Sequence, residues 1–364
     1  MASASHILPF CVLSLSVAAC GATAPSSSGS KSSSKSSSTK RVADTSDSGL
    51  DLSQFGPGDA QVGADVGSDE CNDLIAHDKP TAGDTTPFTI PTGETYGCFY
   101  FQSPFTDEVQ GTGFGAVIDN SRVLHHWLLY DLRSVHDDGD VQRCLGTHPD
   151  AAVLSGWAPG AADTHFPANI GMAIPWGPDG RFVLEVHYVN NTGTTQSDRS
   201  GARICATHTP RPHTAALTWL GTENIGGPMG IPPGETTTVS GTCTPARAGY
   251  PADQLIHTLT VLPHMHKLGR HMQILVHRSG GTTDVLADHD FDYNNQVGFD
   301  MLGEVYEGDT LETRCTYDNT TDHSVPYGPT TAQEMCYAFA IGYPAGALDH
   351  PLPSFAGAQN TCLY

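Results

Sequence analysis

Residues 255–276 read LIHTLTVLPHMHKLGRHMQILV, and at their centre two histidines, His264 and His266, are separated by one residue. Apolar, partly alternating sequence on both sides of the pair is typical of a β-strand. Successive side chains of a strand point to opposite faces of the sheet, so His264 and His266 point the same way. This stretch therefore predicts half of a metal site on a β-sheet, and the other half has to come from elsewhere in the chain.

The rest of the chain also predicts β-structure. Short runs rich in β-branched and aromatic residues are separated by clusters of Gly, Pro, Asn and Asp, and no segment keeps a helical period. These runs are residues 97–102, 123–130, 181–189, 215–220, 236–241, 255–262, 272–276, 310–317 and 336–342. Many short strands with turn signals between them are typical of β-sandwiches and jelly rolls, so we expect an all-β fold. No internal repeat is evident.

Length and charge limit the possible functions. The 364 residues leave room for two domains, and the stretch Thr207–Pro212, which is polar and contains two prolines, is the expected boundary. We therefore predict an N-terminal domain over residues 68–208 and a C-terminal domain over 213–364. The formal net charge of −22 argues against a nucleic-acid partner, because such proteins carry a basic footprint.

The first 67 residues predict export rather than a fold. Residues 1–20 resemble a signal peptide of the lipoprotein type, since an apolar stretch ends in Val17-Ala18-Ala19-Cys20 and is too short to span a bilayer. Ordinary cleavage near Ala24 is the alternative. Residues 21–67 are rich in Ser and Gly and predict a disordered linker. We expect a monomeric head that is lipid-anchored at Cys20 in the cell envelope, or a secreted protein.

The cysteines predict disulfide bonds. Of the ten cysteines, Cys11 and Cys20 belong to the leader, which leaves an even number for the folded part. An even count in an exported chain favours disulfides, and the absence of a CxxC motif argues against a thiolate zinc site. Spacing alone does not choose among the possible pairings.

The first half of the chain carries its own histidines. His125 and His126 are adjacent in HHWLLY, and adjacent residues of a regular strand face opposite ways. A β-bulge or a strand end could bring them onto one ion, and the alternative is one core and one surface histidine. His187, within the apolar run FVLEVHY, is by itself more typical of a hydrogen-bonded core residue.

A methionine in the second half of the chain has two possible roles. Met335 lies in QEMCYAF, where core packing is the usual role of such a residue. It becomes a candidate ligand only if the metal is copper, because a thioether is a soft ligand that favours Cu(I).

The order of these motifs resembles the ascorbate-dependent type II copper monooxygenases, whose members include peptidylglycine α-hydroxylating monooxygenase and dopamine β-monooxygenase. The motifs are HHWLLY, LEVHY, HMHKLGR and EMC, and the resemblance extends over residues 71–364. It includes positions that are not ligands, namely Val117-Ile118-Asp119, Trp157-Ala158-Pro159, Phe166-Pro167 and Leu268-Gly269-Arg270. It implies two tandem jelly-roll-like β-sandwich domains, each with one copper site, that face each other across a cleft.

The resemblance also implies the ligands of two copper ions. His125, His126 and His187, here called the first ligand set, would hold a copper that stores and transfers an electron. A second ligand set would hold the copper that binds O₂ and faces the substrate, and its residues would be catalytic. These residues are His264, His266 and Met335. Ascorbate, or a similar one-electron donor, would be the reducing co-substrate.

Disulfide pairing follows from the resemblance as well. In the first domain it implies Cys71 with Cys205 and Cys98 with Cys144. In the second domain it implies Cys243 with Cys362 and Cys315 with Cys336.

The implied activity is hydroxylation of a C–H bond in a small organic substrate with O₂. The substrate itself does not carry over. Peptide-amidating members place an arginine two residues before the HxH motif, where this chain has Leu262, and their Asn and Tyr after the methionine correspond to Tyr337 and Phe339. Peptidylglycine is therefore not the expected substrate. The alternative function is a non-catalytic, copper-binding or copper-buffering envelope lipoprotein, although two ligand sets of different softness favour an enzyme.

Overall fold

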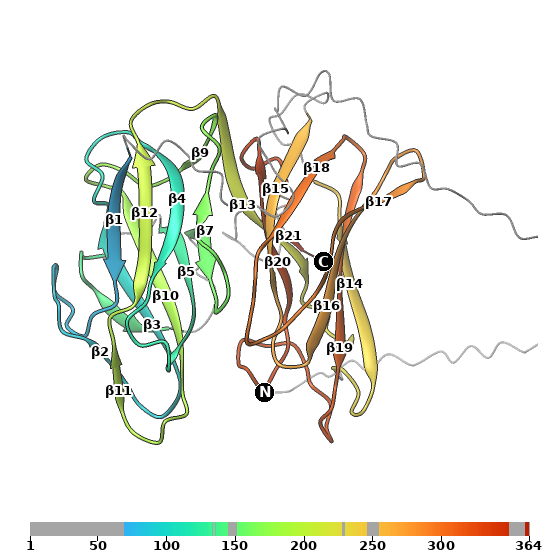
Figure 1. The fold of residues 1–364 in the computed structure, drawn as a ribbon, viewed down its shortest axis with the longest axis horizontal. Helices are drawn as coiled ribbons and strands as arrows, with labels where there is room; N and C mark the ends of the chain where they lie inside the picture. Colours follow the sequence, from blue (N-terminus) through green and yellow to red (C-terminus); the bar gives the residue numbers. More distant parts are fainter. Residues whose placement is uncertain are drawn as a thin grey trace, which may run out of the picture. The chain divides into compact units, whose positions relative to one another are not determined.

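The structure is a computed structural model that describes residues 69–363 except 133, 135, 145–150, 228–229, 246–254 and 349–360. The expected leader and linker, including Cys20, lie outside the described residues. Strands β1 to β21 make up the regular structure of the described part, which confirms the all-β prediction (Figure 1). No helix in these ranges is long and apolar enough to cross a membrane.

The first β-sandwich contains the strands up to β12. One of its sheets has the order β6 (Val141–Arg143), β3 (Gly93–Gln102), β10 (Arg181–Asn190), β5 (Leu124–Leu132) and β7 (Ala151–Trp157). The other contains β1 (Glu70–Ile75), β12 (Gly201–Thr207), β4 (Gln110–Val117) and β9 (Ile170–Ala173), with β8 (Thr164–His165) beside β4. A short pair is formed by β2 (Phe88–Ile90) and β11 (Gln196–Asp198). The core of this first sandwich contains the fully buried side chains of Phe99, Leu129 and Leu184.

The second β-sandwich repeats this arrangement. One sheet has the order β14 (Thr236–Cys243), β19 (Thr310–Asp318), β16 (Gly269–His277) and β17 (Thr283–Asp290). The other contains β13 (His213–Thr222), β20 (Cys336–Tyr343), β15 (Ile256–His264) and β18 (Phe299–Val305), with β21 (Thr361–Leu363) beside β13. Met265, Met272, Ile274 and Tyr317 belong to its apolar core.

Strand β13 belongs to the sheets of both sandwiches. It pairs in parallel with β9, from His213 opposite Ile170 to Ala215 opposite Met172, and antiparallel with β20. One ten-stranded sheet therefore continues from β1 to β18. The predicted boundary at residues 207–212 directly precedes this shared strand, and the exact division into domains stays a prediction.

A buried asparagine closes the same turn in each sandwich. The Asn190 amide donates hydrogen bonds to the carbonyls of Ile90 and Pro91, both at 3.1 Å. The Asn319 amide does the same to Ile231 and Pro232, both at 2.9 Å. The segments that accept these bonds read IPTGET (90–95) and IPPGET (231–236). The two sandwiches thus share a repeated element, which is too short to stand out in the sequence.

Four disulfides brace the sandwiches, and all four implied pairings are confirmed. They are Cys71–Cys205, Cys98–Cys144, Cys243–Cys362 and Cys315–Cys336. Cys315 lies in β19 and Cys336 in β20, so this bond joins the two sheets of the second sandwich just after Met335.

Candidate metal centre

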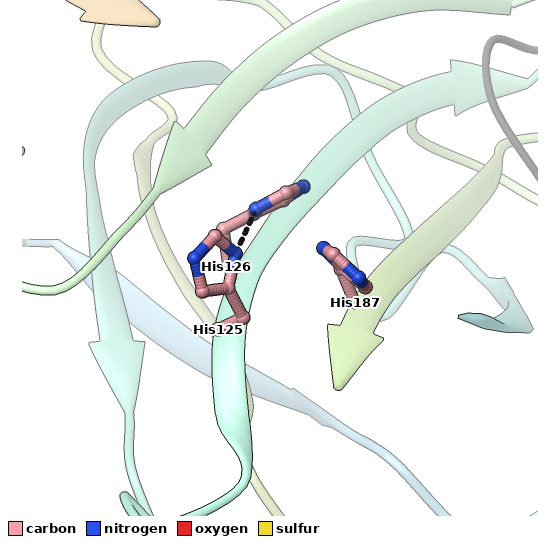
Figure 2. Close-up of side chains that lie close together, drawn as sticks. All are labelled: His125, His126 and His187. Atoms are coloured by element: carbon pink, nitrogen blue, oxygen red, sulfur yellow. Dashed lines mark hydrogen bonds between the residues drawn. The ribbon is translucent and has the colours of Figure 1, made fainter. Parts of the chain in front are cut away.

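A β-bulge brings His125 and His126 together. Along the pairing of β10 with β5, His187 lies opposite His126 and the next residue, Tyr188, lies opposite Leu124, so His125 is the extra residue. Nδ1 of His125 lies 2.9 Å from Nδ1 of His126, and the ring of His187 on the neighbouring strand faces both (Figure 2). Ligand atoms from the three histidines lie within 4.8 Å of one another. The structure therefore contains the β-bulge that was considered from the sequence as a way to bring His125 and His126 together.

The first ligand set fits a metal ion. Burial lowers the pKa of His125 to about 3 and that of His126 well below its usual range, so both imidazoles are neutral and offer a lone pair. Nδ1 of His187 has no hydrogen-bond partner among the described residues. The three imidazoles would hold one ion between them, since their ring nitrogens lie within 4.8 Å of one another.

Glu94 and Tyr96 of β3 hold the ring of His187. The Glu94 carboxylate lies 3.5 Å from Nε2 of His187, and the Tyr96 ring stacks on the imidazole at 4.0 Å. Glu94 also accepts a hydrogen bond from the hydroxyl of Thr331, and His187 together with Thr331 lowers the pKa of Glu94 to about 2. A carboxylate on one ring nitrogen orients the other toward a metal, as metal-binding histidines commonly require.

His264 is the last residue of β15, and His266 lies two residues beyond the strand rather than on it as predicted; the Nδ1 atoms of both are occupied. Nδ1 of His266 lies 2.9 Å from the carbonyl of Gln333, and Nδ1 of His264 lies 3.3 Å from Oε1 of Gln296. Both partners are acceptors, so each Nδ1 carries the hydrogen and each Nε2 keeps a free lone pair. Burial lowers the pKa of His264 to about 3 and that of His266 to about 4. Two neutral Nε2 donors are therefore available to one ion.

Glu334 connects Met335 to these histidines. Its buried carboxylate accepts hydrogen bonds from the backbone N–H of His266 at 2.8 Å and of Leu268 at 2.7 Å. Met335 follows directly, and its carbonyl accepts a 2.7 Å hydrogen bond from the Tyr317 hydroxyl. Met335, His264 and His266 line one cavity of ≈50 Å³. The second ligand set therefore joins two segments that are far apart in the sequence.

The two ligand sets face each other at short range. The rings of His126 and His264 are 5.3 Å apart, nearly perpendicular. His126 also lines the cavity that His264, His266 and Met335 border. The structure thus brings all six predicted ligands to one region, three from the first sandwich and three from the second.

Several residues that support the ligands were not predicted from the sequence. Glu94, Gln296 and Glu334 contact ligand side chains or the backbone beside them, and each reaches across a long sequence interval. Only Glu334 carried a signal, because it stands next to Met335 within the EMC motif.

Comparison with known proteins gives the family. Residues 84–195 match the N-terminal domain, and residues 214–353 the C-terminal domain, of the copper type II ascorbate-dependent monooxygenases. DBH-like monooxygenase protein 1 of Gallus gallus is 32% identical over 69% of this chain and 44% of its own length. Putative DBH-like monooxygenase protein 2 of Homo sapiens is 30% identical over 75% of this chain and 57% of its own length.

Dopamine beta-hydroxylase of Bos taurus is 34% identical over 54% of this chain and 33% of its own length. The chain spans about half the length of the first two relatives. Both matched domains occur in the family's order, one on each sandwich. The chain therefore belongs to the copper type II ascorbate-dependent monooxygenase family.

Proposed function

We propose that this chain hydroxylates a C–H bond of a small organic substrate with O₂ and a one-electron reductant such as ascorbate. The observation that supports the proposal is that His126 and the three residues of the second ligand set line one cavity, where imidazole and thioether side chains of different softness lie close together. A protein that only stores copper has no need of a thioether-containing set beside an all-imidazole set.

The chemistry of the bound ions sets the requirement for two sites. Copper at the two sites would supply one-electron redox chemistry, and the balance RH + O₂ + 2e⁻ + 2H⁺ → ROH + H₂O needs two electrons. His125, His126 and His187 would hold the ion that stores one electron. His264 and His266 would hold the other ion together with Met335, whose soft sulfur favours Cu(I).

Aromatic side chains of the same cavity exclude water from the second ligand set. Trp219, Tyr337 and Phe339 line it, and all three side chains are buried. The Tyr337 hydroxyl donates to Glu223 at 3.0 Å, which fixes the ring next to Met335. An apolar wall of this kind strengthens electrostatic interactions inside the site and limits wasteful reaction with water.

The test is oxygen consumption by the copper-loaded protein. We expect ascorbate-dependent O₂ uptake in the presence of a substrate, with a product heavier by one oxygen atom in an untargeted mass screen. Met335→Ile should abolish this uptake. A protein that binds two copper ions but consumes no O₂ with any C–H donor would support the copper-binding lipoprotein instead.

The substrate of this chain is proposed to differ from a peptide ending in glycine. Leu262, Tyr337 and Phe339 stand at positions where peptide-amidating members have Arg, Asn and Tyr. The wall they form offers no cation to a carboxylate. Turnover of a glycine-extended peptide as fast as the best substrate found in the screen would overturn this proposal.

We also propose that the folded part is an exported, monomeric head anchored by lipid at Cys20. The four disulfides support export, because such bonds persist in oxidising compartments. Cys20→Ala should move the expressed protein from the membrane fraction to the soluble fraction. Unchanged fractionation would contradict the anchor.

A further inference from the structure

A larger cavity, of ≈130 Å³, lies beside the two ligand sets. Its apolar lining includes Phe166 from the first sandwich and Leu217, Leu259, Leu262, Phe339 and Ile341 from the second. A small cavity of ≈20 Å³, which His126 and His264 border, shares Leu262 and Phe339 with it. These two side chains therefore separate the larger cavity from the candidate metal centre.

Strand alternation explains why the cavity and the ligands share one face. Thr260, Leu262 and His264 follow one another at every second position of β15, so they point to the same side of the sheet. Phe339 of β20 lies directly opposite Leu262. A two-residue step along a strand is about 7 Å, so a group seated beyond Leu262 lies farther than this from His264, and only a carbon that extends from it past Leu262 comes nearer.

A bulge in β15 adds to the apolar lining. The pairing of β15 with β18 and β20 shifts between Thr258 and Thr260, which leaves Leu259 as the extra residue. Leu259 and Thr260 both line the cavity as a result. The Thr260 hydroxyl already donates a hydrogen bond to the carbonyl of Phe299 at 2.9 Å, so it does not need an acceptor on a ligand.

The charge around the cavity selects against anions. Its lining contains no Lys or Arg, and its three titratable side chains, Asp163, His165 and Asp300, belong to exposed residues. Carboxylates at the rim repel an anion such as ascorbate, and an apolar interior penalises any charged group that loses its water. A cavity of about 150 Å³ lined by apolar side chains holds benzene, so this one matches a single ring.

We propose that this cavity is the substrate pocket and that it takes a neutral, apolar group about the size of a benzene ring, with the reactive carbon extending past Leu262 and Phe339 toward His264. The inference rests on the proposed function, since only then is the bound molecule a substrate. The exclusion of charged groups is a property of the cavity alone and is tested separately.

The first experiment measures binding of three probes of similar size to the metal-free protein by calorimetry. Toluene is neutral, benzoate is an anion and benzylamine is a cation. Toluene should bind at least about tenfold more tightly than either ion, because each ion loses water on entering the apolar interior. Equal or tighter binding of benzoate or benzylamine would overturn the inference.

A matched pair of glycine variants locates the site. Gly298 lines the cavity, and a Cβ built there meets its nearest atom, the Val261 carbonyl oxygen, at 3.6 Å, so Gly298→Leu should fold and reduce the cavity. Gly280 has open space around it, away from the cavity, and Gly280→Leu is the control. Thermal unfolding verifies that both variants fold. Toluene binding should weaken at least about tenfold in Gly298→Leu only. Unchanged binding in Gly298→Leu would overturn the inference.

The same variants separate this inference from the proposed function. With copper and ascorbate, the wild type should convert toluene to a product heavier by one oxygen, and Gly298→Leu should raise KM more than it lowers kcat. The wild type could bind toluene more tightly than Gly298→Leu and yet take up no O₂. That result would support the cavity as a binding site and overturn the proposed function instead.

Discussion

Nδ1 of His125 lies 2.9 Å from Nδ1 of His126, although the two residues are neighbours in one strand. The bulge that permits this has a counterpart in the second sandwich, where the pairing of β16 with β19 shifts between Gly269 and His271 and leaves Arg270 as the extra residue. The repeated fold thus provides the same bulge twice, and only the first carries a histidine pair. The second sandwich offers its candidate ligands from two other places, at and just after the end of β15 and directly before β20.

His125→Ala should remove one imidazole from the first ligand set and leave the second unchanged. We expect the Cu(II) affinity of the first set to fall at least about tenfold, because two ligands remain of three. Electron paramagnetic resonance should record fewer coupled nitrogens. His271→Ala is the control, since His271 of β16 pairs with Asp288 of β17 at 2.8 Å, away from the first ligand set. An unchanged nitrogen coupling in His125→Ala would exclude His125 as a ligand.

Met335→Ile should weaken Cu(I) binding much more than Cu(II) binding. The thioether is a soft donor, and Ile offers a similar volume without sulfur. Competition titrations with Cu(I) and Cu(II) chelators measure both affinities, with Met272→Ile, in the buried core, as the control. Equal Cu(I) affinities in wild type and Met335→Ile would show that Met335 is only a packing residue.

Glu334→Ala should destabilise the fold and disturb the second ligand set together. It leaves the N–H groups of His266 and Leu268 without their acceptor, at about 1–3 kcal/mol for each buried group. Urea unfolding measures the loss, and Glu307→Ala, at an exposed position, is the control. Copper bound by the second set should weaken while the first set keeps its affinity. Stability equal to that of wild type would contradict this role of Glu334.

Glu185→Gln should make the protein more stable above about pH 5. Burial raises the pKa of Glu185 from 4.5 to about 8, so the unfolded state binds fewer protons than the folded state between these values. The free energy of unfolding contributed by this group is complete below pH 4.5 and is lost as pH rises toward 8, by up to about 1.4 kcal/mol per unit.

Glutamine has the shape of the protonated acid and does not ionise, so Glu185→Gln avoids that loss. Urea unfolding at intervals from pH 5 to 8 should give a stability difference between variant and wild type that grows with pH. A constant difference would mean that Glu185 is already ionised in the folded protein.

The sequence predicted those parts of the molecule that depend on local pattern. All nine expected strand runs fall on observed strands, because β-branched and aromatic residues alternate there. Strand β4 was missed because its sequence, QGTGFGAV, is rich in glycine. Glycine is required at these positions, since a Cβ at Gly113 would lie 2.8 Å from the Thr164 carbonyl oxygen of neighbouring β8.

The contacts that hold the candidate ligands could not be predicted from local sequence pattern. Glu94 meets Thr331 only when the two sandwiches come together, and Gln296 meets His264 only after the second sandwich has folded. Neither pair has a spacing that indicates contact, because the partners lie on different segments. The ligand types themselves were predictable only through the resemblance to a known family.

The copper content of the purified protein, after removal of loosely bound metal, tests most directly whether both ligand sets bind copper. We expect two copper ions per chain in the wild type and one in each of His126→Ala and His264→Ala, because each variant disables one ligand set. One ion per chain in the wild type, or equal copper content in all three proteins, would contradict this expectation.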